Sequence, residues 1–147
     1  MKPTSQEKKA RFIKFYEEGI PFHKFLGLKV LALKKGFVKL HFPLRPELIG
    51  NVMGGHWHGG VVASALDSAG GMAAASLLKS NADKLSTLDI RVDYLKHCKG
   101  KAVIATGQVV RAGKSSIVLD LKAYDEETDE VLADGRAVFS VRRAEEG

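Results

Sequence analysis

The sequence predicts an α+β domain in which an antiparallel sheet of five to six strands wraps around one long central helix. Residues 60–79 form the longest apolar segment, rich in Gly and Ala, and Asp67 is its one acidic side chain. The four segments that follow alternate apolar and polar residues with period two, as half-buried strands do. A sheet with one apolar face needs a cover, and this helix is the one element apolar enough to provide it.

The residues before this helix predict a shorter helix and two strands. Thr4 and Glu7 have the spacing of a capping box, and Gly19 ends the helix that they begin. Strands follow near residues 28–33 and 37–42, joined by a turn at residues 34–36. A proline then begins a glycine-rich loop that reaches residue 58. We expect residues 1–21 to be a helical extension and residues 22–147 to be the main domain.

The residues after the long helix predict four strands joined by short turns, and therefore an antiparallel meander. In the first of these strands Leu88, Ile90 and Val92 share a parity and are expected to face the same way. The other three strands lie near residues 102–110, 117–123 and 131–141. Small residues on the long helix would let the backbone of the sheet approach it closely.

Length and composition fit one ordinary globular domain. The chain has 147 residues, a single cysteine, Cys98, and a net charge of +6. One cysteine forms no internal disulfide, and the N-terminus has no apolar run typical of a secretion signal, so we expect a cytoplasmic protein. A basic surface suits phosphorylated ligands. Because the sequence has no motif that reads nucleic acid, we expect neither a nucleic-acid nor a membrane partner.

Asp67 needs a chemical explanation, because an unpaired buried charge costs several kcal/mol. Helical spacing places Gly60, Ser64, Asp67 and Gly71 on one stripe that lacks bulky side chains. Just before this stripe, the glycines of the His58–Gly60 sequence permit close backbone approach, and the first helical turn offers unpaired N–H groups. Such groups can hold the negative charge that develops on a thioester carbonyl under attack. Asp67 would then activate water as a base, or attack directly.

Other interpretations of these residues stay open at this point. Asp67 can be a purely structural carboxylate, and the two glycines can be a simple helix entry. His56 and His58 form an H-x-H pair, but no third ligand has a suitable spacing, so no metal site is expected. A Ser-His-Asp triad that uses Ser64 or Ser68 would need a nucleophile-elbow pattern, which the sequence does not contain.

These residues resemble the helix signature of PaaI-like acyl-CoA thioesterases, which have the hot-dog fold. In that signature an Asp lies seven residues after the last Gly of an HGG sequence, as Asp67 does after Gly60. The similarity continues through the predicted strands to a closing A-x-G-x-A-x-F sequence, and it covers residues 22–142. The resemblance implies a hot-dog fold and hydrolysis of an acyl-CoA thioester, with coenzyme A as part of the substrate and no separate cofactor.

The resemblance also implies roles for individual residues. Asp67 would be the general base or nucleophile, and the backbone N–H of Gly59 or Gly60 would polarise the thioester carbonyl. His58 would shape the HGG turn, and Thr87 would assist from the start of the following strand.

Further residues are expected around this centre. Asn51 corresponds to an Asn that positions water or the carbonyl, although it precedes His58 by seven residues where relatives have six. Basic residues at strand ends and turns would contact the phosphates of coenzyme A: Lys96, Lys99, Lys101, Arg111 and Lys114. Four large apolar side chains would line the acyl site or fill the core: Phe22, Phe25, Trp57 and Met72.

The assembly is expected to be at least a homodimer, and a homotetramer of two such dimers by the same resemblance. In it, Asp67 of one chain faces the HGG turn of the other. Two other functions stay open: a non-catalytic acyl-CoA-binding module on the same fold, and a hot-dog hydratase or dehydratase. Whether the acyl group is an aryl group or a medium to long fatty chain does not follow from the sequence.

Overall fold

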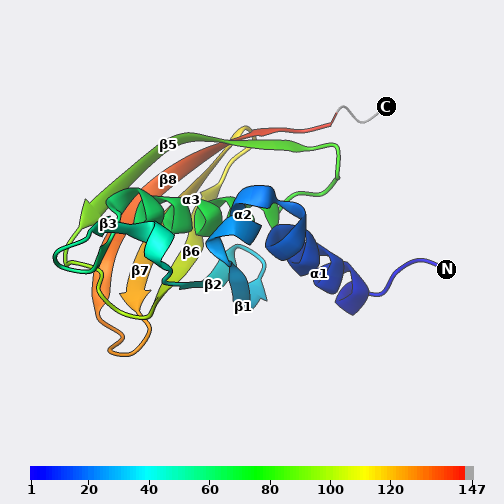
Figure 1. Cartoon of the computed structure of the whole chain (residues 1–147). Coiled ribbons are helices and arrows are strands. Elements are labelled where there is room, and N and C mark those ends of the chain that lie inside the picture. Colours follow the sequence, from blue (N-terminus) through cyan, green and yellow to red (C-terminus); the bar gives the residue numbers. More distant parts are fainter. Residues whose placement is uncertain (145–147) are drawn as a thin grey trace.

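The computed structural model describes residues 1–144, and a six-stranded antiparallel sheet curves around the central helix α3 (Gly59–Ala75) (Figure 1). The strand order across the sheet is β1-β2-β6-β7-β8-β5. The strands are β1 (Lys29–Lys34), β2 (Phe37–Pro43), β5 (Lys84–Tyr94), β6 (Ala102–Ala112), β7 (Ser116–Asp125) and β8 (Val131–Arg142). The architecture predicted from periodicity is therefore confirmed.

The apolar face of the sheet packs on α3, as the alternation of β7 illustrates. Ile117, Leu119, Leu121 and Ala123 are all buried, whereas the polar residues between them face away. The contact between sheet and helix is close at Gly107 of β6, where a Cβ atom would lie 2.5 Å from a backbone oxygen of α3. No side chain larger than hydrogen fits there, so a glycine on the sheet complements the small residues of the helix.

The predicted meander of four strands is wrong for its first member. β6, β7 and β8 are consecutive neighbours, but β5 pairs with β8 and lies at the far edge, while β2 occupies the place beside β6. Three strand spacings of about 4.8 Å separate β5 from β6. Residues 95–101 are long enough to cross this distance, because seven extended residues span roughly 23 Å.

The side-chain parity of β5 also differs from the prediction. Thr87 pairs with Phe139 and Asp89 pairs with Val138, so Leu88 is the extra residue of a β-bulge. Leu88 is accordingly exposed, not turned toward α3. A bulge shifts the alternation by one residue, which explains how Thr87 faces α3 on the N-terminal side of the bulge.

The helix α3 begins within one residue of its predicted start but ends four residues before its predicted end. Ser76 follows its last residue, donates its hydroxyl hydrogen to the Ala73 carbonyl at 2.6 Å, and accepts a hydrogen bond from the Gly36 N–H at 2.8 Å. A serine hydroxyl that bonds to nearby backbone competes with helix continuation. Ser76 therefore ends the helix and joins it to the β1–β2 turn.

The segment predicted as a loop between residues 43 and 58 holds short regular elements. It contains a 3₁₀ turn (Pro46–Leu48) and a small hairpin of β3 (Ile49–Asn51) and β4 (His56–Trp57). The hairpin delivers the chain to the first turn of α3 from outside the main sheet.

The N-terminal segment forms two helices beside the C-terminal half of α3 (Figure 1). α1 (Ser5–Lys14) begins with the predicted capping box, since the Glu7 N–H donates to Thr4 Oγ1 at 3.2 Å and the Thr4 N–H donates to Glu7 Oε2 at 2.7 Å. A π-helical turn at Phe15–Gly19 joins it to α2 (Pro21–Leu26). The predicted boundary at residue 22 falls inside α2, and residues 145–147 of the predicted main domain lie outside the described residues. The division into an extension and a main domain stays a prediction.

Candidate active site

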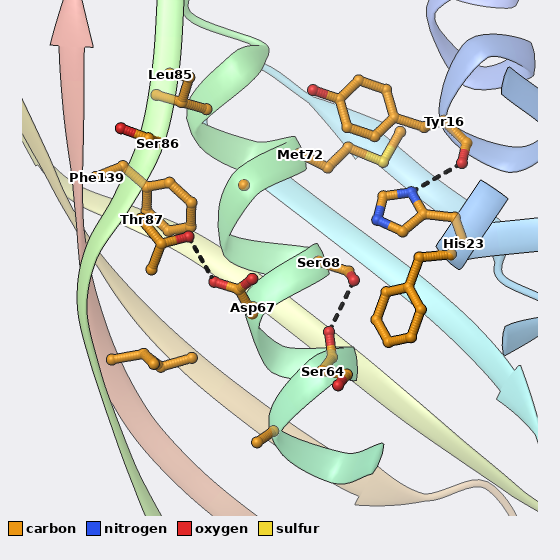
Figure 2. A pocket seen from close by; sticks show the side chains of 14 residues that line it. Tyr16, His23, Ser64, Asp67, Ser68, Met72, Leu85, Ser86, Thr87 and Phe139 are labelled. Carbon is orange, nitrogen blue, oxygen red and sulfur yellow. Dashed lines mark hydrogen bonds between the residues drawn. The ribbon is translucent and has the colours of Figure 1, made fainter. Parts of the chain in front are cut away.

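The residues around Asp67 line an open cavity of about 500 Å³, called here the Asp67 trough (Figure 2). Its floor is the exposed stripe of α3, one wall is β5 with Phe139 of β8, and the other wall is the N-terminal segment. The lining residues are Tyr16, Phe22, His23, Ala63, Ser64, Asp67, Ser68, Gly71, Met72, Leu85, Ser86, Thr87, Ile90 and Phe139. Three members of the stripe predicted from helical spacing, Ser64, Asp67 and Gly71, therefore face a cavity, whereas Gly60 is not in its lining.

Asp67 is half-buried and is held by one side-chain hydrogen bond. Thr87 Oγ1 donates to Asp67 Oδ1 at 2.9 Å, so the predicted pair of Asp67 and Thr87 is brought together across α3 and β5 (Figure 2). No Lys or Arg among residues 1–144 lines the trough. The carboxylate is thus not locked to a cation, and its second oxygen stays available for chemistry.

The two serines beside Asp67 are occupied by the helix itself. Ser64 Oγ donates to the Gly60 carbonyl and Ser68 Oγ donates to the Ser64 carbonyl, both at 2.7 Å. A hydroxyl whose hydrogen is held by a helix carbonyl is not poised to act as a nucleophile. This geometry argues against a Ser-His-Asp triad.

Tyr16 and His23 form the opposite wall, and the sequence analysis did not identify either as a site residue. His23 Nδ1 lies 2.9 Å from the Tyr16 carbonyl oxygen; since a carbonyl only accepts, the hydrogen is assigned to Nδ1. Burial lowers the pKa of His23, although this carbonyl and the charge of Asp67 oppose the shift. Burial raises the pKa of Tyr16 to about 12. Both groups are therefore neutral at neutral pH.

The first turn of α3 opens on a second cavity of about 310 Å³, called here the Gly59 cleft. It is lined by His56, Trp57, Gly59, Val62, Tyr94, Leu95, Lys96, His97, Cys98 and Leu132. His58 is the N-cap of α3, and its Nδ1 accepts the Gly60 N–H at 2.9 Å. Among residues 1–144 the Gly59 N–H has no hydrogen-bond acceptor. Of the two predicted carbonyl-polarising donors, Gly59 is thus the one that is available.

The Gly59 carbonyl is fixed by a further contact that the sequence analysis missed. The Tyr94 hydroxyl, at the end of β5, donates to this carbonyl at 2.7 Å. The Gly59–Gly60 peptide is therefore held at both of its polar groups, because Tyr94 donates to its carbonyl oxygen and His58 Nδ1 accepts from its N–H. The predicted role of His58 in shaping the turn is consistent with its bond to Gly60.

Asn51 lies at the end of β3, away from the trough lining. Its Oδ1 accepts the Gly54 N–H at 3.0 Å, which closes the β3–β4 turn. Within one chain, Asn51 therefore does not meet Asp67, and its predicted role stays a prediction.

The predicted group of cations is divided by the length of β6. Lys96, Lys99 and Lys101 precede this strand, whereas Arg111 and Lys114 lie at its other end. An eleven-residue strand is roughly 36 Å long, so the two groups cannot rim the same mouth of one chain. Lys96, which forms an ion pair with Glu130, lines the Gly59 cleft.

The four large apolar side chains predicted to line the acyl site or fill the core lie in different places. Phe22 and Met72 line the Asp67 trough, Trp57 is buried beside the Gly59 cleft, and Phe25 is half exposed beside Arg45.

The described residues contain no group of three His, Cys, Asp or Glu side chains that would hold a metal ion. The ring of His56 stacks on that of His97 with centroids 4.4 Å apart.

Cys98 lies in the segment between β5 and β6 and is buried. Burial, with the charge of Asp125, raises the pKa of the Cys98 thiol to about 12. The thiolate is the reactive form of cysteine, so Cys98 is inert at neutral pH.

Comparison with known proteins agrees with this arrangement. A family model described as the thioesterase superfamily matches residues 54–132. The medium/long-chain acyl-CoA thioesterase YigI of Escherichia coli strain K12 is 32% identical over 120 residues, which are 74% of this chain and 77% of that protein.

Solved structures agree as well. A Shewanella oneidensis protein related to the thioesterase superfamily superposes with a TM-score of 0.83 and 30% identity, over 97% of this chain and 100% of that one. The Escherichia coli PaaI protein from the phenylacetic acid degradation operon has the same fold, with a TM-score of 0.76 and 21% identity over 92% of this chain and 90% of that one.

A single helix held in a curved antiparallel sheet, with a carboxylate on its open stripe, defines a hot-dog domain. This chain belongs to the thioesterase superfamily, as a hot-dog-fold hydrolase of thioesters. The family resemblance noted in the helix and strand sequences is therefore confirmed. None of the helices in residues 1–144 has the length and apolar character needed to cross a membrane.

Proposed function

We propose that this protein hydrolyses the thioester of acyl-CoA molecules, with Asp67 as the general base or nucleophile. The observation that carries the proposal is the position of Asp67 on the floor of an open trough, oriented by Thr87 and free of any cation. The similarity to an acyl-CoA thioesterase over 74% of the chain supports the choice of substrate class.

The chemistry assigns one task to each half of the site. Attack on the thioester carbonyl converts its oxygen into an oxyanion, which the Gly59 N–H at the positive end of α3 would stabilise. In the general-base form, Asp67 removes a proton from the attacking water while the new C–O bond forms. The C–S bond then breaks, and the thiolate of coenzyme A leaves and takes up a proton.

These two tasks require two chains. Asp67 follows Gly59 by eight residues on the same helix, which corresponds to about 12 Å along the axis. The base must lie within reach of the water that attacks the carbonyl carbon, and the oxyanion donor must contact the oxygen bonded to that carbon. Two groups about 12 Å apart on one helix cannot meet both requirements at once. We infer that a second copy supplies the donor, in a homodimer that pairs the trough of each chain with the Gly59 cleft of the other. A tetramer of two dimers is the larger form expected.

The substrate would lie across both halves. The acyl group would occupy the Asp67 trough, whose lining holds no cation, and the phosphates of coenzyme A would lie near cations at the rim of the cleft. Of the candidates, Lys96 is supported by its place in the lining of the Gly59 cleft. Lys99 follows Lys96 by three residues in the same segment. Arg111 and Lys114 would contact the phosphates only if the partner chain brings that end of its β6 to the rim of the Gly59 cleft.

Steady-state hydrolysis of acyl-CoA by an Asp67→Asn variant tests the proposal. Because a positioned base contributes about 10²–10⁴-fold, we expect kcat to fall by at least about 100-fold. Asp89→Asn, which changes an exposed acid on the face of β5 that points away from α3, is the control and should retain wild-type activity. Unchanged turnover in Asp67→Asn would refute the proposed role, and binding of acyl-CoA without turnover by the wild type would indicate a non-catalytic module.

A mixing experiment tests the two-chain site separately. Asp67→Asn and Gly59→Pro chains each lack one half of the site, so each alone should be inactive. Random exchange of subunits makes half of the dimers mixed, each with one intact site, so about a quarter of wild-type activity should return. No recovery after verified subunit exchange would place both groups in one chain.

A further inference from the structure

A third cavity, distinct from the Gly59 cleft, continues the Asp67 trough along α3. It has a volume of about 250 Å³ and is lined by Phe12, Phe15, Tyr16, Ala75, Leu78, Lys79, Ser80, Asn81 and Asp83. The last helix residues in the trough lining are Gly71 and Met72, and Ala75 is one turn further on the same face. The trough and this third cavity therefore lie in series on one side of the chain, with the third cavity beyond the C-terminal end of the trough.

Tyr16 separates them. Among residues 1–144 it is the one residue that lines both cavities. Figure 2 shows its ring beside Met72, at the end of the trough away from Ser64. The Tyr16 ring is thus a partition between the trough and the space beyond it.

This partition is held firmly in place. The Tyr16 ring stacks on His23 with centroids 5.9 Å apart and contacts Phe12 at 4.7 Å and Phe15 at 5.5 Å. The Tyr16 backbone carbonyl accepts the hydrogen bond of His23. Tyr16 also lies in the π-helical turn, a form of helix that is common at functional sites.

The lining between Asp67 and Tyr16 suits an alkyl chain. Met72, Leu85 and Phe139 supply apolar surface there, and Gly71 leaves the floor free of a side chain. No Lys or Arg among residues 1–144 lines this part of the trough, and Lys79 lies only in the cavity beyond Tyr16, so the acyl group is the part of the substrate that fits here.

We propose that Tyr16 sets the upper length of the acyl chain by closing the trough at this end. The inference rests on the proposed function and assigns medium-length fatty acyl groups to the wild-type protein. Tyr16 lies between Met72, which lines the trough, and Ala75, which lines the cavity beyond it. These two residues follow Asp67 by five and eight positions, about 7.5–12 Å along α3, and an extended alkyl chain advances about 1.3 Å per bond, so the partition lies roughly six to nine carbons from the carbonyl.

The test is the dependence of kcat/KM on acyl length, from C4 to C16, with each acyl-CoA below its micelle concentration. For the wild type we expect a rise of up to about fourfold per methylene and a decline beyond about ten carbons. Tyr16→Ala joins the two cavities and should move the optimum at least about four carbons higher, since each further methylene can then be buried. Tyr16→Phe keeps the ring and should keep the wild-type optimum.

Two further variants separate this effect from general loosening. Leu78→Ala removes a side chain that lines the cavity beyond Tyr16 but not the trough and is not among the rings that hold Tyr16, so it should leave the optimum in place. Tyr16→Leu removes less volume than Tyr16→Ala and should give a smaller shift in the same direction, which keeps the test usable if Tyr16→Ala does not fold.

The outcomes are distinguishable from failure of the proposed function. If hydrolysis depends on Asp67 but folded Tyr16→Ala and Tyr16→Leu keep the wild-type optimum, the length limit is overturned and the proposed function stands. A shift of the optimum in Leu78→Ala equal to that in Tyr16→Ala also overturns it. If no acyl-CoA is hydrolysed, the proposed function fails and the length limit fails with it.

Discussion

Thr87 Oγ1 donates a hydrogen bond of 2.9 Å to Asp67 Oδ1, and this bond links the edge strand β5 to the central helix in the middle of the trough. The bond fixes which oxygen of the carboxylate is occupied and which is free. It exists because the bulge at Leu88 turns Thr87 toward α3. The catalytic carboxylate proposed here is therefore oriented by a residue from an element that follows it in the chain.

Replacing Thr87 by Val removes this donor and keeps the shape of the side chain. A hydrogen bond to a charged group is worth roughly 1.5–3 kcal/mol, and solvent reaches this pair, so we expect kcat/KM for acyl-CoA to fall by about tenfold. Thr87→Ser retains the hydroxyl and should stay within about twofold of wild type. Steady-state kinetics measure both, and wild-type activity in Thr87→Val would show that Asp67 does not depend on this bond.

Gly59→Pro is a selective test of the proposed oxyanion donor. Gly59 is the first residue of α3, where proline is favoured, and His58 already has the extended conformation (φ −63°, ψ 132°) that precedes proline. The substitution removes the Gly59 N–H and no intrahelical hydrogen bond. We expect the fold and the thermal midpoint to be kept, while kcat falls by about 10²–10³-fold. The control is Gly59→Ala, which retains the N–H; loss of activity in both variants would point to steric exclusion of the substrate.

Lys96 and Lys114 provide a matched pair for locating the phosphates of coenzyme A. Both are exposed lysines that sequence analysis assigned to these phosphates, but only Lys96 lines the Gly59 cleft. Lys96→Met should raise KM several-fold, and more at low ionic strength, because screening weakens a charge contact as salt increases. Lys114→Met should leave KM unchanged. The reverse result would place coenzyme A at the other end of β6.

The Asp67 site could be predicted because its evidence is local in sequence. Asp67, Gly59 and Gly60 lie within one helix, whose period fixes their spacing. Thr87 was identified through the family resemblance, while its parity depends on a bulge that strict alternation does not predict. The separation of Lys96 from Arg111 follows from the length of β6.

Tyr16 and His23 show what the sequence could not reveal. Their helical segment was predicted from the capping box and an apolar cluster, but its docking beside the C-terminal half of α3 depends on contacts between residues about 50 apart. The order of the strands was missed for the same reason. A period of two identifies β5 as a strand, whereas its pairing with β8 depends on the seven-residue connection that lets the chain cross the sheet.

The partly buried side chain of Tyr16 predicts a loss of stability at alkaline pH. Burial raises the pKa of Tyr16 to about 12, whereas in the unfolded chain the hydroxyl titrates near about 10. As pH rises, the unfolded state loses this proton first, so the contribution to stability is complete below pH 10 and declines between about pH 10 and 12. At pH 11 the loss should be about 1 kcal/mol.

Tyr16→Phe isolates this contribution, because it keeps the ring and has no hydroxyl to ionise. Urea unfolding at pH 8 and pH 11 should show that the wild type loses about 1 kcal/mol more than the variant over this interval. The Cys98 thiol, whose raised pKa acts in the same direction, is present in both proteins and cancels from the difference. Equal losses in the two proteins would mean that the Tyr16 hydroxyl ionises as readily in the folded state as in the unfolded chain. That result would also weaken the assignment of this ring as a closed partition at the end of the trough.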